Sequence, residues 1–272
     1  SPPLKYARIL VLGCNGGESL LSFAASFPFS RVVGIDLVTE SKEERHYQLM
    51  QSAPENLELY SFSVEQIMGL QDNNWDYIVV QDHFSLLNNS ITFALLNNMA
   101  GLLSSDGIIA MQWACLPGSV QLDTIRDALQ IYSGQEASLE LQLARAKLML
   151  ASLSMTDDTQ VAYYESIKSV SLSDVLFAHH YLETSRDSKY FLEVNSHIEE
   201  IGLCYIGDGT PAGELPESHG KQVEDLQNAL GENSQKILIQ QNLDLLTNRA
   251  KRFSFFAHKK HTDSISALPT IS

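Results

Sequence analysis

A buried strand, a glycine turn and a second buried strand that ends on an acidic residue stand near the start of this sequence. Residues 9–12 are apolar, glycines follow at positions 13, 16 and 17, and the next apolar segment ends on Asp36. Glycines let the backbone turn tightly after a parallel strand and approach a ligand closely. Asp36, at the tip of the next strand, is suited to accept hydrogen bonds from two ribose hydroxyls. Residues 7–37 therefore predict half of a nucleotide-cofactor site.

The glycine spacing separates the cofactor classes that use this arrangement. A phosphate-binding P-loop ends in GK[ST], and no such ending follows here. A dinucleotide fingerprint needs GxGxxG, but the corresponding positions hold Gly13, Asn15 and Glu18. The Glu18 carboxylate at a helix N-terminus would repel a pyrophosphate, whereas it suits a cofactor with a cationic or neutral end. S-adenosylmethionine, which carries a sulfonium and an amino group, fits this loop better than NAD or FAD.

Composition excludes several other classes. The chain has 272 residues and 44% hydrophobic content, enough for one large domain or a core with a smaller one. Its net charge of -15 argues against a general nucleic-acid binder. We expect neither a membrane-spanning segment nor a signal peptide. Cys14, Cys115 and Cys204 lie in apolar contexts without metal-like spacing, so we expect a reduced cytoplasmic protein with no metal site.

Strands and helices alternate in the first part of the chain. The segment WDYIVV is nearly continuously apolar, as in a central parallel strand. The pattern predicts an α/β fold with a parallel sheet. Because the first strand begins almost at residue 1, we expect a fragment of a longer protein with helices ahead of it. Strands are predicted at 9–12, 31–35, 57–62, 75–80 and 107–113, with helices at 18–27, 41–51, 64–70 and 91–103.

The character of the sequence changes after Pro117. Residues 120–201 are helical by periodicity, most clearly at 137–153, 160–170, 172–183 and 189–201. Strand candidates return at 203–207 and 253–258, with helices near 221–230 and 234–248 between them. These two strands could form the antiparallel pair that closes a seven-stranded sheet. We expect a core at 1–118, a helical insertion or appended domain at 119–201, closing elements at 202–261 and a flexible tail at 262–272.

A basic cluster follows the last predicted helix. It consists of Arg249, Lys251 and Arg252. We expect it to be a solvated helix end.

Four segments together resemble a class I S-adenosylmethionine-dependent methyltransferase: VLGCNGGES, VVGIDL, WDYIVVQDHFSLL and GIIAMQWACLPG. FAHHYLETSRDSKYF at 177–191 resembles the signature of the methyltransferase regulatory domain, and LDLLTNRAKRFSFF at 243–256 resembles its closing segment. The resemblance implies a bacterial protein with a Rossmann-like seven-stranded sheet and S-adenosylmethionine as cofactor. Some members of this group, the rickettsial-type ones, are protein-lysine methyltransferases acting on outer-membrane proteins, so a protein lysine is the implied acceptor.

The resemblance also implies which residues hold the cofactor. The glycine loop lies under its methionine and ribose portions, Asp36 holds the ribose, and Leu37 lies beside the adenine. Ser63 and Val64 stand where the adenine amine is capped, with Ser63 in place of the common Asp. Gln81 begins the methyl-transfer face after the fourth strand. The implied loop residues are Gly13, Cys14, Asn15, Gly16 and Gly17.

Catalytic candidates follow from the chemistry of a lysine acceptor. A lysine must lose a proton before attack, and Asp82, His83 or His179 could accept it. Phe84 and Tyr181 could steady the ammonium by cation-π contact. Simpler interpretations are a strand-end cap for the first two candidates and helix packing for His179 and Tyr181.

Two other functions stay open. One is a small-molecule methyltransferase. The other is a non-catalytic cofactor-binding protein, suggested by Ser63 and by His180 and Arg186, which stand where the family signature has Glu and Asn. We expect no nucleic-acid partner and no membrane insertion, and the sequence leaves the oligomeric state open.

Overall fold

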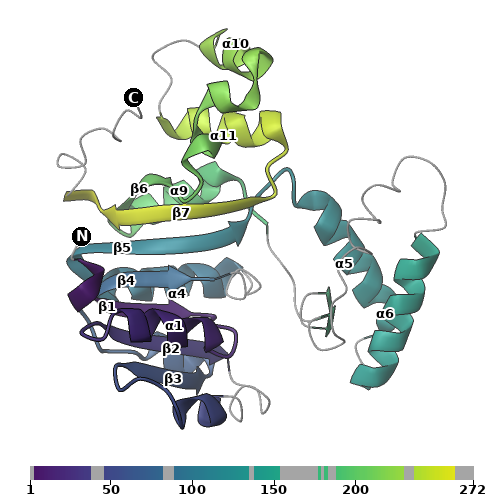
Figure 1. The fold of residues 1–272 in the computed structure, drawn as a ribbon. Helices are drawn as coiled ribbons and strands as arrows, with labels where there is room; N and C mark the ends of the chain where they lie inside the picture. The colour runs from purple at the N-terminus through teal and green to yellow at the C-terminus, as the bar shows by residue number, and fades with distance from the viewer. Residues whose placement is uncertain are drawn as a thin grey trace.

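A seven-stranded sheet with helices on both faces organises the chain (Figure 1). The computed structural model describes residues 3–37, 46–81, 89–134, 138–153, 177–178, 181–182, 188–229 and 236–260. The strand order is β3-β2-β1-β4-β5-β7-β6. The strands are β1 (Arg8–Leu12), β2 (Arg31–Leu37), β3 (Leu57–Phe62), β4 (Trp75–Val80), β5 (Leu103–Ala114), β6 (Leu203–Asp208) and β7 (Lys251–His258).

The sheet is parallel except for one strand. The first five strands pair in parallel, whereas β7 lies antiparallel between β5 and β6. The predicted antiparallel closure of a seven-stranded sheet is therefore confirmed. Because β1, β2, β4 and β5 are parallel, their carboxyl ends meet at one edge of the sheet, where α/β folds bind ligands. The division into domains at residues 118, 201 and 261 stays a prediction.

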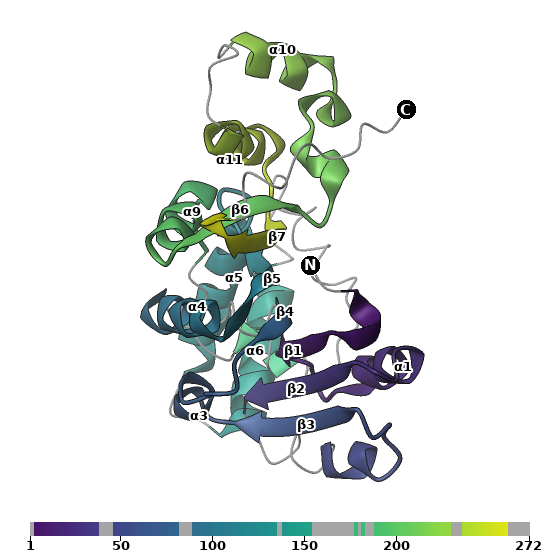
Figure 2. The same cartoon turned by 90° about the vertical axis from the view of Figure 1, so that its left-hand side faces the viewer.

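Helices cover both faces of the sheet. In Figure 2, α1 lies on one side of the strands, while α4 and α9 lie on the other. The pair α5 and α6 packs together beside the sheet (Figure 1). The helices are α1 (Glu18–Ser26), α3 (Val64–Met68), α4 (Asn89–Leu102), α5 (Val120–Ser133), α6 (Leu139–Leu153), α9 (Phe191–Glu200), α10 (Lys221–Ala229) and α11 (Lys236–Thr247), with short 3-10 helices η1 (Leu4–Tyr6), η3 (Pro211–Glu214) and η4 (Pro216–His219).

Three predicted helical regions lie partly or wholly outside the described residues. Residues 46–50 form the described part of the helix predicted at 41–51. The helix predicted at 160–170 lies outside the described residues, as does most of the one at 172–183. Among the helices that are described, none has the length and apolar content needed to cross a bilayer.

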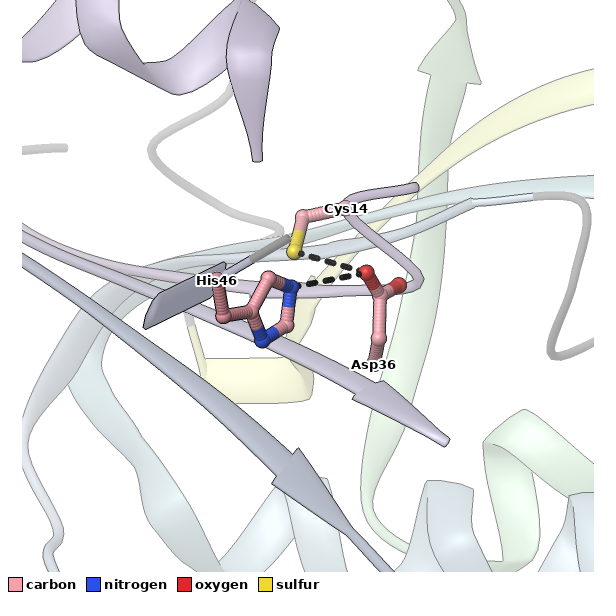
Figure 3. A group of neighbouring side chains, drawn as sticks. All are labelled: Cys14, Asp36 and His46. Atoms are coloured by element: carbon pink, nitrogen blue, oxygen red, sulfur yellow. Dashed lines mark hydrogen bonds and ion pairs between the residues drawn. The ribbon is translucent and has the colours of Figure 1, made fainter. Parts of the chain in front are cut away.

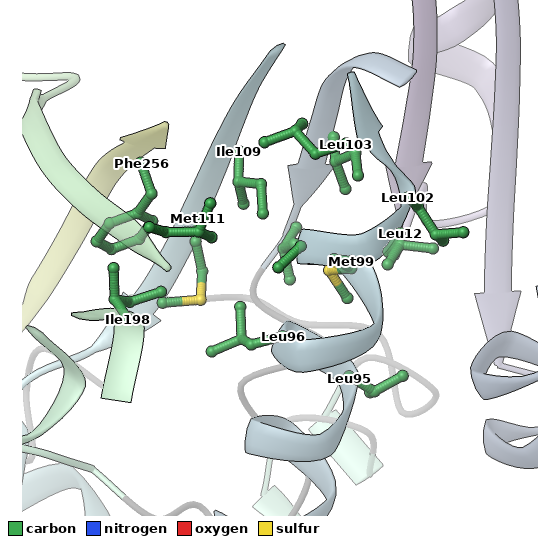
Figure 4. Close-up of a cluster of buried hydrophobic side chains, with 14 of the residues drawn as sticks. Leu12, Leu95, Leu96, Met99, Leu102, Leu103, Ile109, Met111, Ile198 and Phe256 are labelled. Carbon is green, nitrogen blue, oxygen red and sulfur yellow. The ribbon is translucent and has the colours of Figure 1, made fainter. Parts of the chain in front are cut away.

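The side chains of β1 alternate between two buried faces. Leu10 and Leu12 join the main core, whereas Ile9 and Val11 join a second cluster under α1. Figure 4 shows the main core, in which α4 contributes Leu96 and Met99, and β7 contributes Phe256. A strand that is buried on both faces needs apolar residues at nearly every position, which explains the continuous apolar runs in the sequence.

The prediction that the basic cluster is a solvated helix end is wrong for Arg252. Helix α11 ends at Thr247, and Arg252 belongs to β7 with 1% of its surface exposed. Its Nε donates a 2.7 Å hydrogen bond to Asp244, and its guanidinium also pairs with Asp208 at 3.3 Å. Arg249 is mostly buried as well, at 3.4 Å from Asp208, whereas Lys251 is exposed. Arg249 and Arg252 therefore anchor α11 and β6 to β7.

Arg252→Met should test this anchor. We expect the free energy of unfolding to fall by about 3–5 kcal/mol, because Asp244 and Asp208 would stay buried without their cation. Lys251→Met, one residue earlier in the same strand, should change it by less than about 0.5 kcal/mol. Urea unfolding of both variants measures the difference, and equal losses would show that the buried ion pairs contribute little.

Candidate functional site

The turn after β1 adopts left-handed backbone conformations. Gly13, Gly16 and Gly17 have φ values of 81°, 85° and 86°, and Asn15 has a φ of 49°. A residue with a Cβ atom rarely adopts such values, so the glycines are required by the path of the chain. The turn ends where Gly17 caps α1 and Glu18 begins it. Glu18 is exposed, so its carboxylate faces solvent at the helix N-terminus, as the sequence predicts.

Asp36 closes this turn from the neighbouring strand. Its side chain is fully buried, and its carboxylate accepts hydrogen bonds from the backbone N–H groups of Asn15 at 2.9 Å and Gly16 at 2.6 Å. The thiol of Cys14 donates a third, at 3.4 Å. Bonds from several donors stabilise a buried carboxylate in its charged form. The structure thus brings together the glycine loop and the acid that the sequence singles out.

His46 is a member of this site that the sequence analysis missed. We predicted a polar surface helix there, but His46 is only 4% exposed. Figure 3 shows its ring pointing at the Asp36 carboxylate, with Nε2 at 3.2 Å from Oδ2. Its Nδ1 lies 3.1 Å from the hydroxyl of Ser61 in β3. No local pattern marks this histidine, because its burial depends on the pairing of β2 with β3.

Cys14, Asp36 and His46 also satisfy a distance criterion for metal ligands. One ligand atom from each lies within 4.8 Å of the others. The sequence spacing gave no hint of this group, since the residues are far apart in the chain. A different cysteine, Cys115, is fully buried, and burial raises its pKa to about 12, so it is a neutral thiol.

The turn after β3 holds the residues expected near the adenine. Ser63 caps α3: its hydroxyl accepts a bond from the N–H of Gln66 and donates a 2.7 Å bond to Glu65. That bond lowers the pKa of Glu65. Glu65 thus supplies a carboxylate beside the position where Ser63 replaces the usual acid. Val64 is the first residue of α3, and Leu37 is half-buried at the end of β2.

The residues expected at the methyl-transfer face are only partly described. Gln81 follows β4, is half-buried, and donates its backbone N–H to Leu12 at 3.0 Å. Tyr181 is buried in a helical cluster, with its ring centroid 5.0 Å from that of Phe177. These contacts are of the packing kind, and a substrate role for Tyr181 stays a prediction. Asp82, His83, Phe84 and His179 lie outside the described residues.

An open groove lies near the carboxyl end of β5, where Leu116 is one of its lining residues. It is lined by Phe93 of α4, by Lys189 and Tyr190, and by Glu193, His197 and Glu200 of α9. The rings of Phe93 and His197 are stacked at 4.0 Å, and the Lys189 ammonium lies 5.0 Å from the Phe93 centroid. The groove therefore combines an aromatic face that already holds one ammonium with two carboxylates.

Family comparisons agree with this geometry. Residues 9–107 match the family model of a methyltransferase domain, and residues 173–258 match that of a predicted methyltransferase regulatory domain. The chain carries the fold and the domain pair of a class I S-adenosylmethionine-dependent methyltransferase. The first match covers the glycine loop and Asp36, and the second covers α9 and the closing strands.

Individual relatives are rickettsial. The chain is 24% identical to an uncharacterized protein of Rickettsia prowazekii over 95% of its own length and 47% of that protein, and 28% identical to a second one over 70% and 78%. The structure of PKMT2 from Rickettsia typhi in complex with AdoHcy has a TM-score of 0.77 and 25% identity, covering 95% of this chain and 50% of that one. The chain thus spans about half the length of two of these relatives.

Gly17→Ala tests the tight turn between β1 and α1. Residue 17 has a φ of +86°, and a Cβ atom added there would lie 2.6 Å from Leu59 Cδ1. Gly202 has a similar φ of +80°, but a Cβ atom added there would meet nothing within 4 Å. We expect Gly202→Ala to lower the free energy of unfolding by about 1–2 kcal/mol through backbone strain alone. Gly17→Ala should cost about 1–3 kcal/mol more because of the clash. Urea unfolding measures both, and equal losses would show that Leu59 moves aside freely.

Proposed function

We propose that this chain transfers the methyl group of S-adenosylmethionine to a lysine side chain of a protein. The carrying observation is the glycine loop joined to the buried Asp36 at the carboxyl edge of the sheet. The structural similarity to PKMT2 supports a protein acceptor. The proposal extends to a cytoplasmic location, which the free cysteines Cys14, Cys115 and Cys204 favour.

The residues present fit this cofactor. Asp36 lies at the end of β2, where we place the ribose, and its two oxygens accept hydrogen bonds from loop amides that ribose hydroxyls would share or replace. Glu18, exposed at the start of α1, suits a cationic cofactor and would repel a pyrophosphate. Glu65 adds an acceptor for an adenine amine beside Ser63. The proposed cofactor residues are Gly13, Cys14, Asn15, Gly16, Gly17, Asp36, Leu37, Ser63, Val64 and Gln81.

The protein has little covalent chemistry to perform. When bound, the cofactor supplies an activated methyl group on a sulfonium. The chain must align the acceptor amine with that group, exclude water and accept one proton from the lysine ammonium. We assign proton acceptance to Asp82, His83 or His179, and ammonium contact to Phe84 and Tyr181.

Replacement of Asp36 tests the cofactor site. Asp36→Ala should weaken binding of S-adenosylmethionine about a hundredfold, since it removes hydrogen bonds from a charged acceptor. Isothermal titration measures the affinity, with Glu140→Ala, an exposed acid on α6, as the control. Unchanged binding by the Asp36 variant would disprove the ribose placement. If the original chain gave neither heat nor a thermal shift at millimolar cofactor, the catalytic proposal would fail.

Labelled cofactor tests the acceptor. The chain, incubated with methyl-labelled S-adenosylmethionine and a bacterial lysate, should place label in the protein fraction, and hydrolysis should release methylated lysine. The Asp36→Ala variant serves as the control for background labelling. Label only in the low-molecular-weight fraction would show a small-molecule methyltransferase. Cofactor binding without any transfer would favour the non-catalytic binding protein.

A further inference from the structure

Two side chains stand behind Asp36, outside the glycine loop. Ser61 is the residue of β3 that pairs with Asp36 in the register of the parallel strands. Corresponding residues of paired strands project to the same face, so Asp36 and Ser61 lie side by side. His46 contacts both, with Nε2 at 3.2 Å from Asp36 Oδ2 and Nδ1 at 3.1 Å from Ser61 Oγ. The three residues form a continuous hydrogen-bonded chain.

The direction of each bond follows from the inventory of donors. An ionised Asp36 can only accept, so Nε2 of His46 must carry a proton and donate it to Oδ2. In a neutral imidazole Nδ1 then accepts from the Ser61 hydroxyl, and in an imidazolium Nδ1 donates to Ser61 Oγ instead. Because a hydroxyl can donate or accept, Ser61 is a partner for Nδ1 in either form. With Asp36 fully buried and His46 at 4% exposure, bulk water has little access to replace either bond.

We propose that His46 and Ser61 are positioning residues that orient the Asp36 carboxylate for the two ribose hydroxyls of the cofactor. The inference rests on the proposed role of Asp36. The Asn15 amide donates to Oδ1, whereas the Gly16 amide, the Cys14 thiol and Nε2 of His46 all contact Oδ2. Four donors, three from the loop and one from His46, fix the plane of the carboxylate. Two neighbouring hydroxyls can be recognised together only if that plane is fixed.

The test measures how strongly His46 is coupled to the ribose hydroxyls. S-adenosylhomocysteine and its 2′,3′-dideoxyribose analogue are titrated into the original chain and its variants. For His46→Leu we expect about tenfold weaker binding of S-adenosylhomocysteine, and nearly unchanged binding of the analogue, which has no hydroxyls to recognise. Ser61→Ala should give the same pattern with a smaller loss. If His46 acted in folding alone, the variant would bind both ligands more weakly by the same factor, and that result would overturn the proposal.

Amide substitutions provide a rescue. Gln carries its amide nitrogen near the position of Nε2, so His46→Gln should stay within about threefold of the original affinity. Asn places its amide near Nδ1, so His46→Asn should resemble His46→Leu. Gln48→Leu, an exposed residue of the same helix, is the matched control and should change nothing. If His46→Gln bound as weakly as His46→Leu, the donated hydrogen bond would not be the cause.

Two further arms separate the alternatives. Cys14, Asp36 and His46 could instead hold a metal ion, so the titrations are repeated with EDTA and with zinc. Loss of binding in EDTA, restored by zinc, would overturn the hydrogen-bonding role. Asp36→Asn distinguishes this inference from the proposed function: if it bound like the original chain, the ribose placement itself would be wrong. Weak binding by Asp36→Asn with normal binding by His46→Leu would reject the positioning role alone.

Discussion

The hydrogen bonds between the Asp36 carboxylate and the amides of Asn15 and Gly16 join two segments on which the site depends. They fasten the turn after β1 to the end of β2, and they do so inside the protein, where an unpaired carboxylate would be costly. The glycines are needed because only left-handed backbone brings these amides to the acid. Loop and acid therefore constrain each other, and a change in either must disturb both.

The sequence predicted all seven strands because strands buried on both faces leave long apolar runs. It assigned the glycine turn and Asp36 to one cofactor site, but it did not predict the hydrogen bonds between them. It also contained the cap of α3, since Ser63 followed three residues later by Gln66 is a capping box. The burial of His46 and Arg252 could not be predicted from local pattern. His46 stands in a polar segment, and Arg252 in a basic one. His46 is buried because it contacts β3, and Arg252 is buried because it pairs with Asp208 of β6 and Asp244 of α11.

Buried charge is handled in two different ways in this chain. Near the carboxyl end of β1 the buried Asp36 accepts hydrogen bonds from backbone amides, a thiol and His46, whereas at the start of β7 Arg252 is paired with two carboxylates. Amide and thiol donors stabilise the Asp36 carboxylate without cancelling its charge. The arrangement around Arg252 is nearly self-compensating and serves to hold elements together. Burial alone would not distinguish the site from the anchor, but the identity of the partners does.

Strand β7 joins two parts of the chain that match different family models. The methyltransferase family match ends at residue 107, inside β5, and the regulatory family match includes β6 and β7. Backbone hydrogen bonds between β5 and β7 therefore cross from one family segment to the other. Without the second segment, β5 would be a bare edge open to other chains. The two segments therefore share one sheet, even though they match two different family models.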